Sequence, residues 1–296
     1  MSTLDWSSAI TRVLIRGGLG NQLFQLTAGL LVSELHQSPL TLIYSEGVKG
    51  ANVHGDSLKQ IRTHQFSIRE IQADLTATSV RVSTWLSRRS LAVKLLPYFE
   101  TQELGYSPTV FSLRKGVTLI GYFQSYRYLE KLCSLRSERF VVIPRDFSNT
   151  LNRYLHEIKE SNPIALHVRR GDYVGNKSTG LLSQKYYADS LELMNSRGRD
   201  VWVFSDDING ARELLGSLSH PNWKWIDSLN LKSSSQTLYA MSMFSDIIIA
   251  NSTLSWWAAS VNKTSKVIAP GKWFANRTDP IDLISPQWLR VESNWI

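Results

Sequence analysis

The sequence has little of what marks secreted, metal-thiolate and membrane-spanning proteins. It contains one cysteine, Cys133, in 296 residues, which excludes an intrachain disulfide and a site of several thiolates. A single thiol fits a reducing compartment. No run of eighteen or more apolar residues occurs, and residues 1–20 lack the long apolar segment of a secretion signal. We expect a soluble cytoplasmic protein, with any contact at the inner face of the membrane being peripheral.

The charge of the chain favours an acidic partner. The formal net charge is +8, so nucleic acid, an anionic membrane surface and a phosphate-bearing small molecule are the candidates. The basic residues are dispersed and form no nucleic-acid-binding motif. Nucleic acid therefore ranks last.

The most informative stretch of the chain spans residues 164–173 and reads IALHVRRGDY. Its apolar part predicts a buried strand over 164–168, and Gly171 predicts the loop that ends it. Arg169 and Arg170 then stand at the carboxyl end of a strand, where ligands bind in open α/β sheets. Two guanidiniums there suit a phosphate or pyrophosphate, because the planar fork meets phosphate oxygens bidentately. A surface ion-pair cluster is the alternative, and the spacing alone does not separate the two.

Two further apolar runs end in small polar or acidic residues. Residues 201–204 are followed by Ser-Asp-Asp at 205–207, and residues 247–250 by Asn-Ser-Thr at 251–253. If all three runs are parallel strands of one sheet, their C-terminal loops converge on one crevice. This convergence favours arginines that bind a phosphate or pyrophosphate over a surface ion-pair cluster.

The spacing of apolar residues predicts an α/β protein. The second half alternates strands and helices in the manner of a doubly wound parallel sheet. We expect strands at 164–168, 201–204, 223–226, 246–250 and 265–269, and helices at 184–197, 208–216, 234–244 and 254–261. In the first half we expect strands at 12–16, 40–44 and 117–123, a helix ending near residue 37, and a helix within 145–161. The segment 45–84 has no clean period, and an acceptor-binding loop there is a hypothesis.

A glycine-rich loop follows the first expected strand. Residues 17–20 read Gly-Gly-Leu-Gly, and Asn21 and Gln22 then lead into a helix. Such glycines let backbone amides approach a ligand, and a helix N-terminus favours anions. The pattern lacks the third glycine of a dinucleotide fingerprint and the Gly-Lys-Ser/Thr of a Walker loop. Taken alone, it indicates a tight turn more often than a binding site.

Five motifs, in order, resemble those of the bacterial α-1,2-fucosyltransferases. They are GGLGNQLFQ at 17–25, GYFQS at 121–125, HVRRGDY at 167–173, FSDD at 204–207 and NSTLSWWAA at 251–259. The resemblance spans residues 17 to about 274, and the ordered set is far more specific than any one motif. It implies two Rossmann-like domains facing a cleft, which is the GT-B type of glycosyltransferase. The expected domains are 1–155 on the acceptor side and 156–275 on the GDP-fucose side, with a tail at 276–296 packing back on the first domain.

The resemblance also implies a reaction. Fucose would move from GDP-fucose to the 2-hydroxyl of a terminal galactose on an oligosaccharide or lipid-linked glycan, with inversion and without a metal or other cofactor, as in O-antigen biosynthesis. Nothing in the residues separates fucose from other sugars. The alternatives are another inverting glycosyltransferase with a different sugar nucleotide, and a nucleotide-sugar or glycan binding module without turnover.

Three residues are candidates for catalysis. Arg169 and Arg170 would neutralise the charge that builds on the leaving pyrophosphate. Asp172 could take the proton of the acceptor hydroxyl, although beside two arginines it could instead hold a guanidinium in place.

The candidate donor-binding residues come from both halves of the chain. The resemblance implies that His167 contacts the guanine and that a second-domain acid helps to hold the nucleotide. A structural histidine and ordinary helix capping at 251–252 are the respective alternatives. The candidates are Gly18, Gly20, Asn21, Gln22, His167, Arg169, Arg170, Asp206, Asp207, Ser252, Thr253 and Ser255.

The paired arginines and the lack of an Asp-x-Asp metal signature predict activity that survives EDTA. Fixed cations can neutralise the departing pyrophosphate in place of a metal ion. Transfer assays with and without the chelator test this expectation. Loss of activity on chelation, restored by Mn²⁺ or Mg²⁺, would contradict it.

Overall fold

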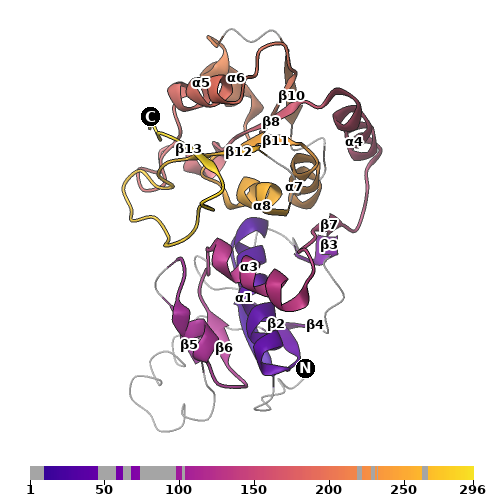
Figure 1. The fold of residues 1–296 in the computed structure, drawn as a ribbon, viewed down its shortest axis with the longest axis vertical. Helices are drawn as coiled ribbons and strands as arrows, with labels where there is room; N and C mark the ends of the chain where they lie inside the picture. Colours follow the sequence, from indigo (N-terminus) through magenta and orange to yellow (C-terminus); the bar gives the residue numbers. More distant parts are fainter. Residues whose placement is uncertain are drawn as a thin grey trace. The chain divides into compact units, whose positions relative to one another are not determined.

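The computed structural model describes residues 10–45, 58–62, 68–73, 98–101, 104–218, 222–227, 231, 233–261 and 266–296. The chain divides into two compact units, each with a parallel sheet of its own (Figure 1). The first unit comprises residues 1–58, 63–140 and 280–283, and the second comprises 59–62, 141–279 and 284–296.

The first unit is built on a five-stranded parallel sheet of order β4-β2-β1-β6-β5. The chain adds β2 and β4 on one side of β1, and β6 and β5 on the other. Strands β1 and β6 are therefore neighbours in the sheet although they lie far apart in the chain. The elements are β1 (Thr11–Ile15), α1 (Leu19–His36), β2 (Leu40–Ser45), η1 (Leu58–Gln60, at the border of the two units), β4 (Ile68–Ala73), β5 (Tyr98–Glu100), η3 (Pro108–Ser112), β6 (Thr118–Ile120) and α3 (Tyr126–Arg136).

Helix α1 packs on this sheet through a broad apolar surface. Leu23, Leu30 and Leu31 are among its fully buried side chains, at spacings that place them on one face of the helix. The helix ends at His36, after which Gln37 takes a left-handed conformation and its N–H donates to the carbonyl of Glu34. α1 has 18 residues, yet no helix in the described part of the chain is long and apolar enough to cross a membrane.

The second unit is built on a six-stranded parallel sheet of order β10-β9-β8-β11-β12-β13. Its strand order changes direction between β8 and β11, as in other doubly wound folds. The sheet strands are β8 (Ile164–Val168), β9 (Val201–Ser205), β10 (Trp223–Asp227), β11 (Asp246–Ile248), β12 (Lys266–Pro270) and β13 (Leu289–Val291). The remaining elements are β3 (Ile61–Arg62), which pairs antiparallel with β7 (Ile143–Pro144), and α4 (Asn149–Ser161), η4 (Gly171–Tyr173), α5 (Gln184–Leu193), α6 (Ile208–Leu215), α7 (Ser234–Ser242) and α8 (Thr253–Val261).

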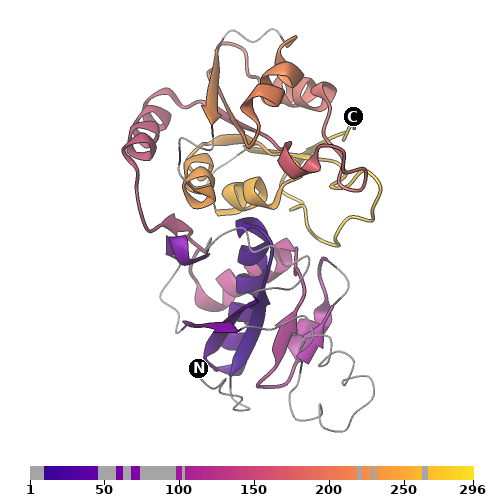
Figure 2. The same ribbon diagram turned by 180° about the vertical axis from the view of Figure 1, so that it is seen from behind.

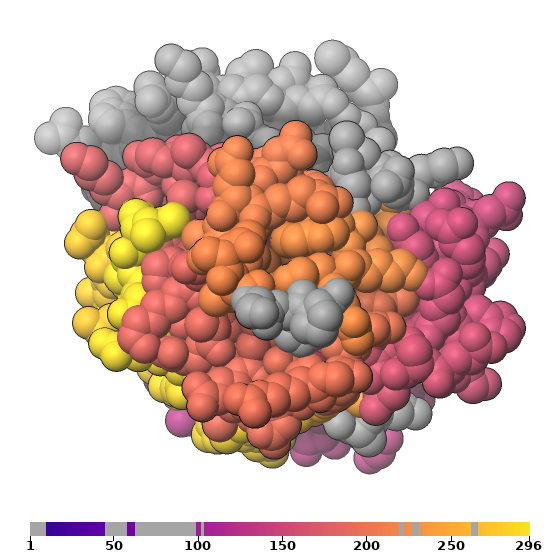
Figure 3. Space-filling model, turned by 90° about the horizontal axis from the view of Figure 1, so that it is seen from above, coloured from indigo at the N-terminus to yellow at the C-terminus, as the bar shows by residue number. Residues whose placement is uncertain are grey.

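Helices cover both faces of the second sheet. Figures 1 and 2 show α5 and α6 on one side of it and α7 and α8 on the other. Leu166 and Val168 of β8 belong to the buried cluster beneath α5 and α6. Trp202 of β9 contacts Tyr154 of α4 and Phe244, with ring centroids 5.3 and 5.5 Å apart. Figure 3 views this unit over α5 and α6, with α4 in magenta at one edge and the C-terminal residues in yellow at the other.

The expected strands and helices of the second half are present, with differences at their ends. Helix α5 ends at Leu193 rather than at 197, and β11 ends at Ile248 rather than at 250. Strand β13 was not expected, because its three residues carry no apolar run. Ser233 caps α7 by accepting from the N–H of Gln236, whereas Ser183 at the start of α5 makes no such bond. Most of the segment 45–84 lies outside the described residues.

The C-terminal residues contact both units in turn. Residues 280–283 group with the first unit and residues 284–296 with the second. In the second unit, β13 pairs with β12, and Trp295 forms a bridge with Leu182. The expected tail at 276–296 is thus divided between the units. The first unit ends its main run at residue 140, and position 155/156, where the sequence placed a domain boundary, lies within helix α4.

Gly180 should be essential where the C-terminal residues pack. Its φ is +74°, and a Cβ would lie 2.6 Å from the Cβ of Ala275 and 2.7 Å from the ring of Trp295. We expect Gly180→Ala to lower the melting temperature clearly more than Gly175→Ala. Gly175 has a φ of +76° but no atom within 4 Å of an added Cβ, so that variant carries only the backbone penalty of about 1–2 kcal/mol. Equal losses in the two variants would contradict the packing.

Candidate functional site

The candidate site lies at the carboxyl ends of β8, β9 and β11, beside the point where the strand order changes direction. Arg169 and Arg170 follow β8, Asp206 follows β9, and Asn251 lies in the loop after β11. Hydrogen bonds join the loop after β8 to the other two loops. The structure thus brings together the three loops that the sequence predicted to converge. Ligands bind at such points because the flanking loops leave a crevice between them.

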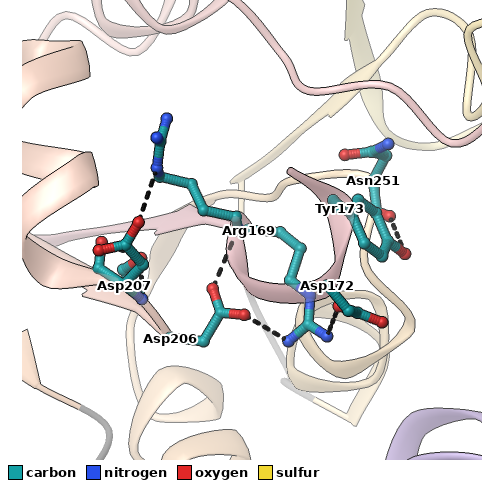
Figure 4. A network of polar contacts seen from close by, with 8 residues as sticks. Arg169, Asp172, Tyr173, Asp206, Asp207 and Asn251 are labelled. Carbon is teal, nitrogen blue, oxygen red and sulfur yellow. Dashed lines mark hydrogen bonds and ion pairs between the residues drawn. The ribbon is translucent and has the colours of Figure 1, made fainter. Parts of the chain in front are cut away.

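Arg169 is held by two carboxylates and an aromatic ring (Figure 4). Its Nη1 lies 2.9 Å from Oδ2 of Asp206, and its Nη2 donates to Oδ1 of Asp172. Its Cζ lies 5.2 Å from the ring centroid of Tyr173. Exposed ion pairs of this kind contribute little to stability. Their effect here is to fix the position of the guanidinium.

Arg170 is held from one side only. Its backbone N–H donates to Oδ1 of Asp206, and its Nε donates to Oδ2 of Asp207, both at 3.0 Å. Within the described part of the chain, Nη1 and Nη2 of Arg170 make no hydrogen bond. The outer edge of this guanidinium therefore remains available to an anion.

The carboxylates of Asp206 and Asp207 bond to protein groups and stay partly exposed to solvent. Asp207 caps α6, and its Oδ1 accepts from the N–H of Gly210 at 2.9 Å. That N–H, and then Arg170, lower the pKa of Asp207. Asp206 lies so close to Gly171 that a Cβ added to Gly171 would lie 2.2 Å from Oδ2 of Asp206. Both aspartates, placed among the donor-binding candidates, act in this structure on the arginines.

His167 is buried at the end of β8 on the sheet face opposite Val168, because side chains alternate along a strand. The residue is 3% exposed. Burial lowers its pKa to about 3, and the positive charge of Arg169 acts in the same direction. Its Nδ1 has no partner among the described residues. His167 is therefore neutral at physiological pH and can donate or accept one hydrogen bond to a neutral group.

The residues after β11 serve mainly to shape the site. The side-chain amide of Asn251 donates to the carbonyls of Thr179, Gly180 and Trp273, at 3.2 to 3.3 Å. The hydroxyl of Tyr173 donates to the carbonyl of Asn251 at 3.2 Å, and burial raises the pKa of this tyrosine. Asn251 thus ties three segments to the end of β11.

Ser252, Thr253 and Ser255 surround the start of α8. Ser252 and Ser255 are buried, and the hydroxyl of Ser255 donates to the carbonyl of Ser252 at 3.1 Å. Thr253 is half-buried at the first position of the helix. Of these three, Thr253 is the one with a partly exposed side chain next to the N-terminal amides.

Two residues with structural roles here carry no signal of their own in the sequence. Tyr173 belongs to the motif at 167–173, and it contacts both Arg169 and Asn251. Asp279 accepts from the N–H groups of Trp273 and Phe274, at 2.8 and 3.0 Å. No spacing signal marks Asp279, because its partners are backbone groups of a loop.

The candidates Gly18, Gly20, Asn21 and Gln22 belong to the first unit. Gly18 precedes α1, whereas Gly20 lies inside its first turn and not in the loop, since the helix begins at Leu19. Gln22 is buried, and its Nε2 donates to the carbonyl of Gly17 at 2.7 Å. Oδ1 of Asn21 accepts from Gln124 at 2.9 Å. These residues form a group within their own unit.

The site has the chemistry of an anion-binding centre. Among the described residues, no group of three or more His, Cys, Asp or Glu side chains is placed to hold a metal ion. The arginines offer positive charge and one available fork edge, while the start of α8 offers amides. Such an arrangement suits a phosphate or pyrophosphate.

His167 should make the protein sensitive to mild acid. An unfolded histidine titrates near pH 6.5, so its low native pKa contributes stability above that pH, which is lost as the pH falls towards 3. We expect wild type to lose roughly 2–3 kcal/mol between pH 6.5 and 4.5 through this residue, a loss that His167→Gln should not show. Melting temperatures across that range test this, with exposed His156 changed to Gln as the control. Equal slopes in all three proteins would refute the assignment.

Comparison with known proteins identifies relatives across nearly the whole chain. A family model described as glycosyl transferase family 11 matches residues 7–292. The α-1,2-colitosyltransferase of Escherichia coli is 30% identical over 295 residues, which cover 94% of this chain and 97% of that protein. The O-antigen biosynthesis glycosyltransferase WbnK of Escherichia coli is 28% identical over 309 residues, covering 94% and 99%.

Solved structures share the fold at low sequence identity. A glycosyl transferase family 9 protein from Veillonella parvula has a TM-score of 0.51 and 11% identity, and the match covers 98% of this chain and 87% of that one. A variant of FUT1 from Arabidopsis thaliana in complex with GDP has a TM-score of 0.51 and 12% identity, covering 88% and 70%. The expected α/β fold of the GT-B class is confirmed.

The resemblance to fucosyltransferases that the five motifs predicted is confirmed as well. The chain is a glycosyltransferase, which sets aside the alternative of a binding module without turnover. With a family match over residues 7–292 and a relative 30% identical across 94% of its length, this protein belongs to glycosyl transferase family 11.

Proposed function

We propose that this glycosyltransferase moves fucose from GDP-fucose to the 2-hydroxyl of a terminal galactose on a glycan, with inversion at the anomeric carbon. The observation that carries the proposal is Arg170, whose Nε is fixed by Asp207 while its Nη1 and Nη2 have no hydrogen-bond partner among the described residues. It stands where the strand order of a doubly wound sheet changes direction. The family match supports transfer as the reaction type.

The reaction breaks one bond and forms another. The acceptor oxygen attacks the anomeric carbon from the face opposite GDP, the bond from that carbon to the β-phosphate oxygen breaks, and GDP leaves with both bonding electrons. The hydroxyl proton passes to a base. Negative charge grows on the pyrophosphate during this step, and a preorganised cation lowers the barrier by stabilising it. In the proposal Arg170 contacts the pyrophosphate, Arg169 adds positive charge, and no metal takes part.

The neighbouring residues have supporting roles. Neutral His167 offers Nδ1 to the donor, and the guanine is the proposed partner. Thr253 and the amides at the start of α8 face the donor's phosphate or sugar. Asp172 pairs with Arg169, which fits the alternative that it holds the guanidinium in place. It remains the candidate base because its side chain is 64% exposed and can exchange that partner for an acceptor hydroxyl.

A donor carrying colitose is the second candidate. It is favoured by the similarity to the α-1,2-colitosyltransferase, which is 30% identical to this chain. The O-antigen glycosyltransferase among the relatives supports a glycan acceptor, such as a galactose-terminated oligosaccharide or its lipid-linked form. Peripheral contact with the inner membrane surface is part of the same proposal. Assays with the two sugar nucleotides in parallel decide which sugar is transferred.

Replacing Arg170 with lysine should abolish most transfer. Lysine keeps the charge but cannot bond Asp207 through one nitrogen and present two more to a pyrophosphate. Loss of a charge-stabilising donor costs roughly 10²–10³ in rate, and we expect at least that drop in kcat for Arg170→Lys, with Arg169→Lys also impaired. Turnover with GDP-fucose and a galactose-terminated acceptor is measured beside the melting temperature.

The matched control is Arg199→Lys. Arg199 lies in the same unit, pairs with Asp246 at 2.6 Å and has a side-chain exposure of 26%. It stands away from the carboxyl ends of the strands, because Asp246 begins β11. Near-normal turnover for Arg199→Lys, with low turnover for the site variants at unchanged melting temperature, supports pyrophosphate binding by Arg169 and Arg170. Near-normal turnover for all three variants would sink it.

A further inference from the structure

The loop after β12, residues 271–279, borders the candidate site. The carbonyl of Trp273 in this loop accepts from the side-chain amide of Asn251 at 3.2 Å. The carbonyl of Asn251 in turn accepts from the hydroxyl of Tyr173 (Figure 4), whose ring lies against the guanidinium of Arg169. Two hydrogen bonds and one ring contact thus connect the loop to the arginines of the site.

Hydrogen bonds anchor this loop on both sides of Arg277. The N–H of Asn276 donates to the carbonyl of Ser178 at 3.3 Å, and its side-chain amide donates to the carbonyl of Lys177 at 2.7 Å. On the other side, the carboxylate of Asp279 accepts from two N–H groups of the loop, at 2.8 and 3.0 Å. The backbone next to Arg277 is therefore fixed relative to the site.

Arg277 has no carboxylate partner within the described part of the chain. Its Cζ lies 4.5 Å from the ring centroid of Phe274, but its guanidinium makes no hydrogen bond or ion pair with a described residue, and the side chain is exposed. Asp279, the acid closest to it in the sequence, is occupied by backbone N–H groups. A guanidinium stacked on a ring keeps the N–H groups along its edges available to a ligand.

The positive charge of Arg277 reaches the site. Burial raises the pKa of Tyr173, and the carboxylates of the site raise it further. The charges of Arg169 and Arg277 lower this pKa, with the effect of Arg277 the smaller of the two. Solvent screens charges beyond about 8 Å at physiological ionic strength, so Arg277 acts on this hydroxyl from nearby.

The two arginines of the site are already neutralised by the protein. Arg169 pairs with Asp172 and Asp206, and Arg170 pairs with Asp207. A pyrophosphate carries negative charge on both of its phosphate groups. A neighbouring guanidinium that no carboxylate offsets would therefore add attraction that the paired arginines do not provide.

We propose that Arg277 is a further donor-binding residue, whose guanidinium contacts a phosphate of the sugar nucleotide held by Arg169 and Arg170. Helix α8 begins shortly after Asn251, which the loop of Arg277 contacts, so the helix amides and this guanidinium serve the same phosphate. The inference rests on the proposed function and deepens it. Arg277 lies beyond the last motif of the resemblance, at 251–259, which gives it no role.

The test measures how the full-length protein binds three probes that separate phosphates from base. Calorimetry measures GDP and inorganic pyrophosphate, and saturation-transfer NMR measures guanosine. The variant is Arg277→Gln, which removes the charge. The matched control is Arg212→Gln, since Arg212 is also exposed, lies in the same unit and stacks on Trp225 with its Cζ 4.6 Å from the ring centroid. Trp225 lies on β10, which β9 separates from β8.

We expect Arg277→Gln to weaken the binding of GDP and of pyrophosphate about tenfold, the effect of one charge-assisted hydrogen bond. Guanosine binding should be unchanged. Because salt screens the contact, the GDP affinity of the wild type should fall more steeply with ionic strength than that of Arg277→Gln. Arg212→Gln should match the wild type in affinity and in salt dependence. With GDP-fucose, the KM for the donor should rise in Arg277→Gln by a similar factor.

Several results would contradict this role of Arg277. Equal GDP affinity and equal salt dependence in the wild type and Arg277→Gln would overturn it, even if the protein transfers fucose. Equal losses in Arg277→Gln and Arg212→Gln would overturn it as well, because they would reflect net charge alone. A structural role would lower the melting temperature and weaken all three probes alike, which also contradicts a phosphate contact.

The same measurements separate this inference from the proposed function. The expected losses in Arg277→Gln without fucose transfer by the wild type would uphold the role of Arg277 and reject the sugar. Pyrophosphate binding that depends on Arg277, in a wild type that binds no GDP, would uphold it and reject the guanine nucleotide. A wild type that binds neither GDP nor pyrophosphate would overturn the inference.

Discussion

The candidate site of the second unit depends on three carboxylates that hold two adjacent guanidiniums in place. Arg169 pairs with Asp172 and Asp206, and Arg170 with Asp207. Each pair is partly exposed, so its contribution to stability is small. What the network contributes is geometry: it fixes Arg170 through Nε and its backbone N–H and leaves Nη1 and Nη2 for an anion. Preorganisation of this kind costs no rearrangement at the moment when charge develops on a leaving group.

The parallel sheets explain why such a network can form. In the second unit the strand order changes direction once, between β8 and β11, and in the first unit β6 lies beside β1. Loops at these points come from strands that are neighbours in space but far apart in the chain. Close approach then demands small residues, as at Gly171 beside Asp206. The result in the second unit is a cationic group at the carboxyl ends of the strands.

The charge of the cationic group in the second unit suits an anionic ligand. Guanidiniums meet phosphate oxygens bidentately. Burial keeps His167 neutral, so the cationic group does not gain a third positive charge at physiological pH. The fold thus supplies the positions at the switch in strand order of the second unit, and the charge of the residues there decides which ligands they suit.

The order of strands and helices in the second half, and the three loops of the site, can be predicted from the sequence alone. A buried parallel strand corresponds to an apolar run in the sequence, and its end corresponds to glycine and polar residues. The strand and its end are therefore both marked by local signals. Only the tertiary structure decided which carboxylate holds which arginine. Asp206 and Asp207 reach Arg170 across 36 and 37 residues, a distance over which spacing carries no information. Strand β13 also could not be predicted, because three residues are too few to show a period. Nor could the amides of the first unit that have no partner among the described residues, because hydrogen bonds between distant segments exist only once those segments pack together.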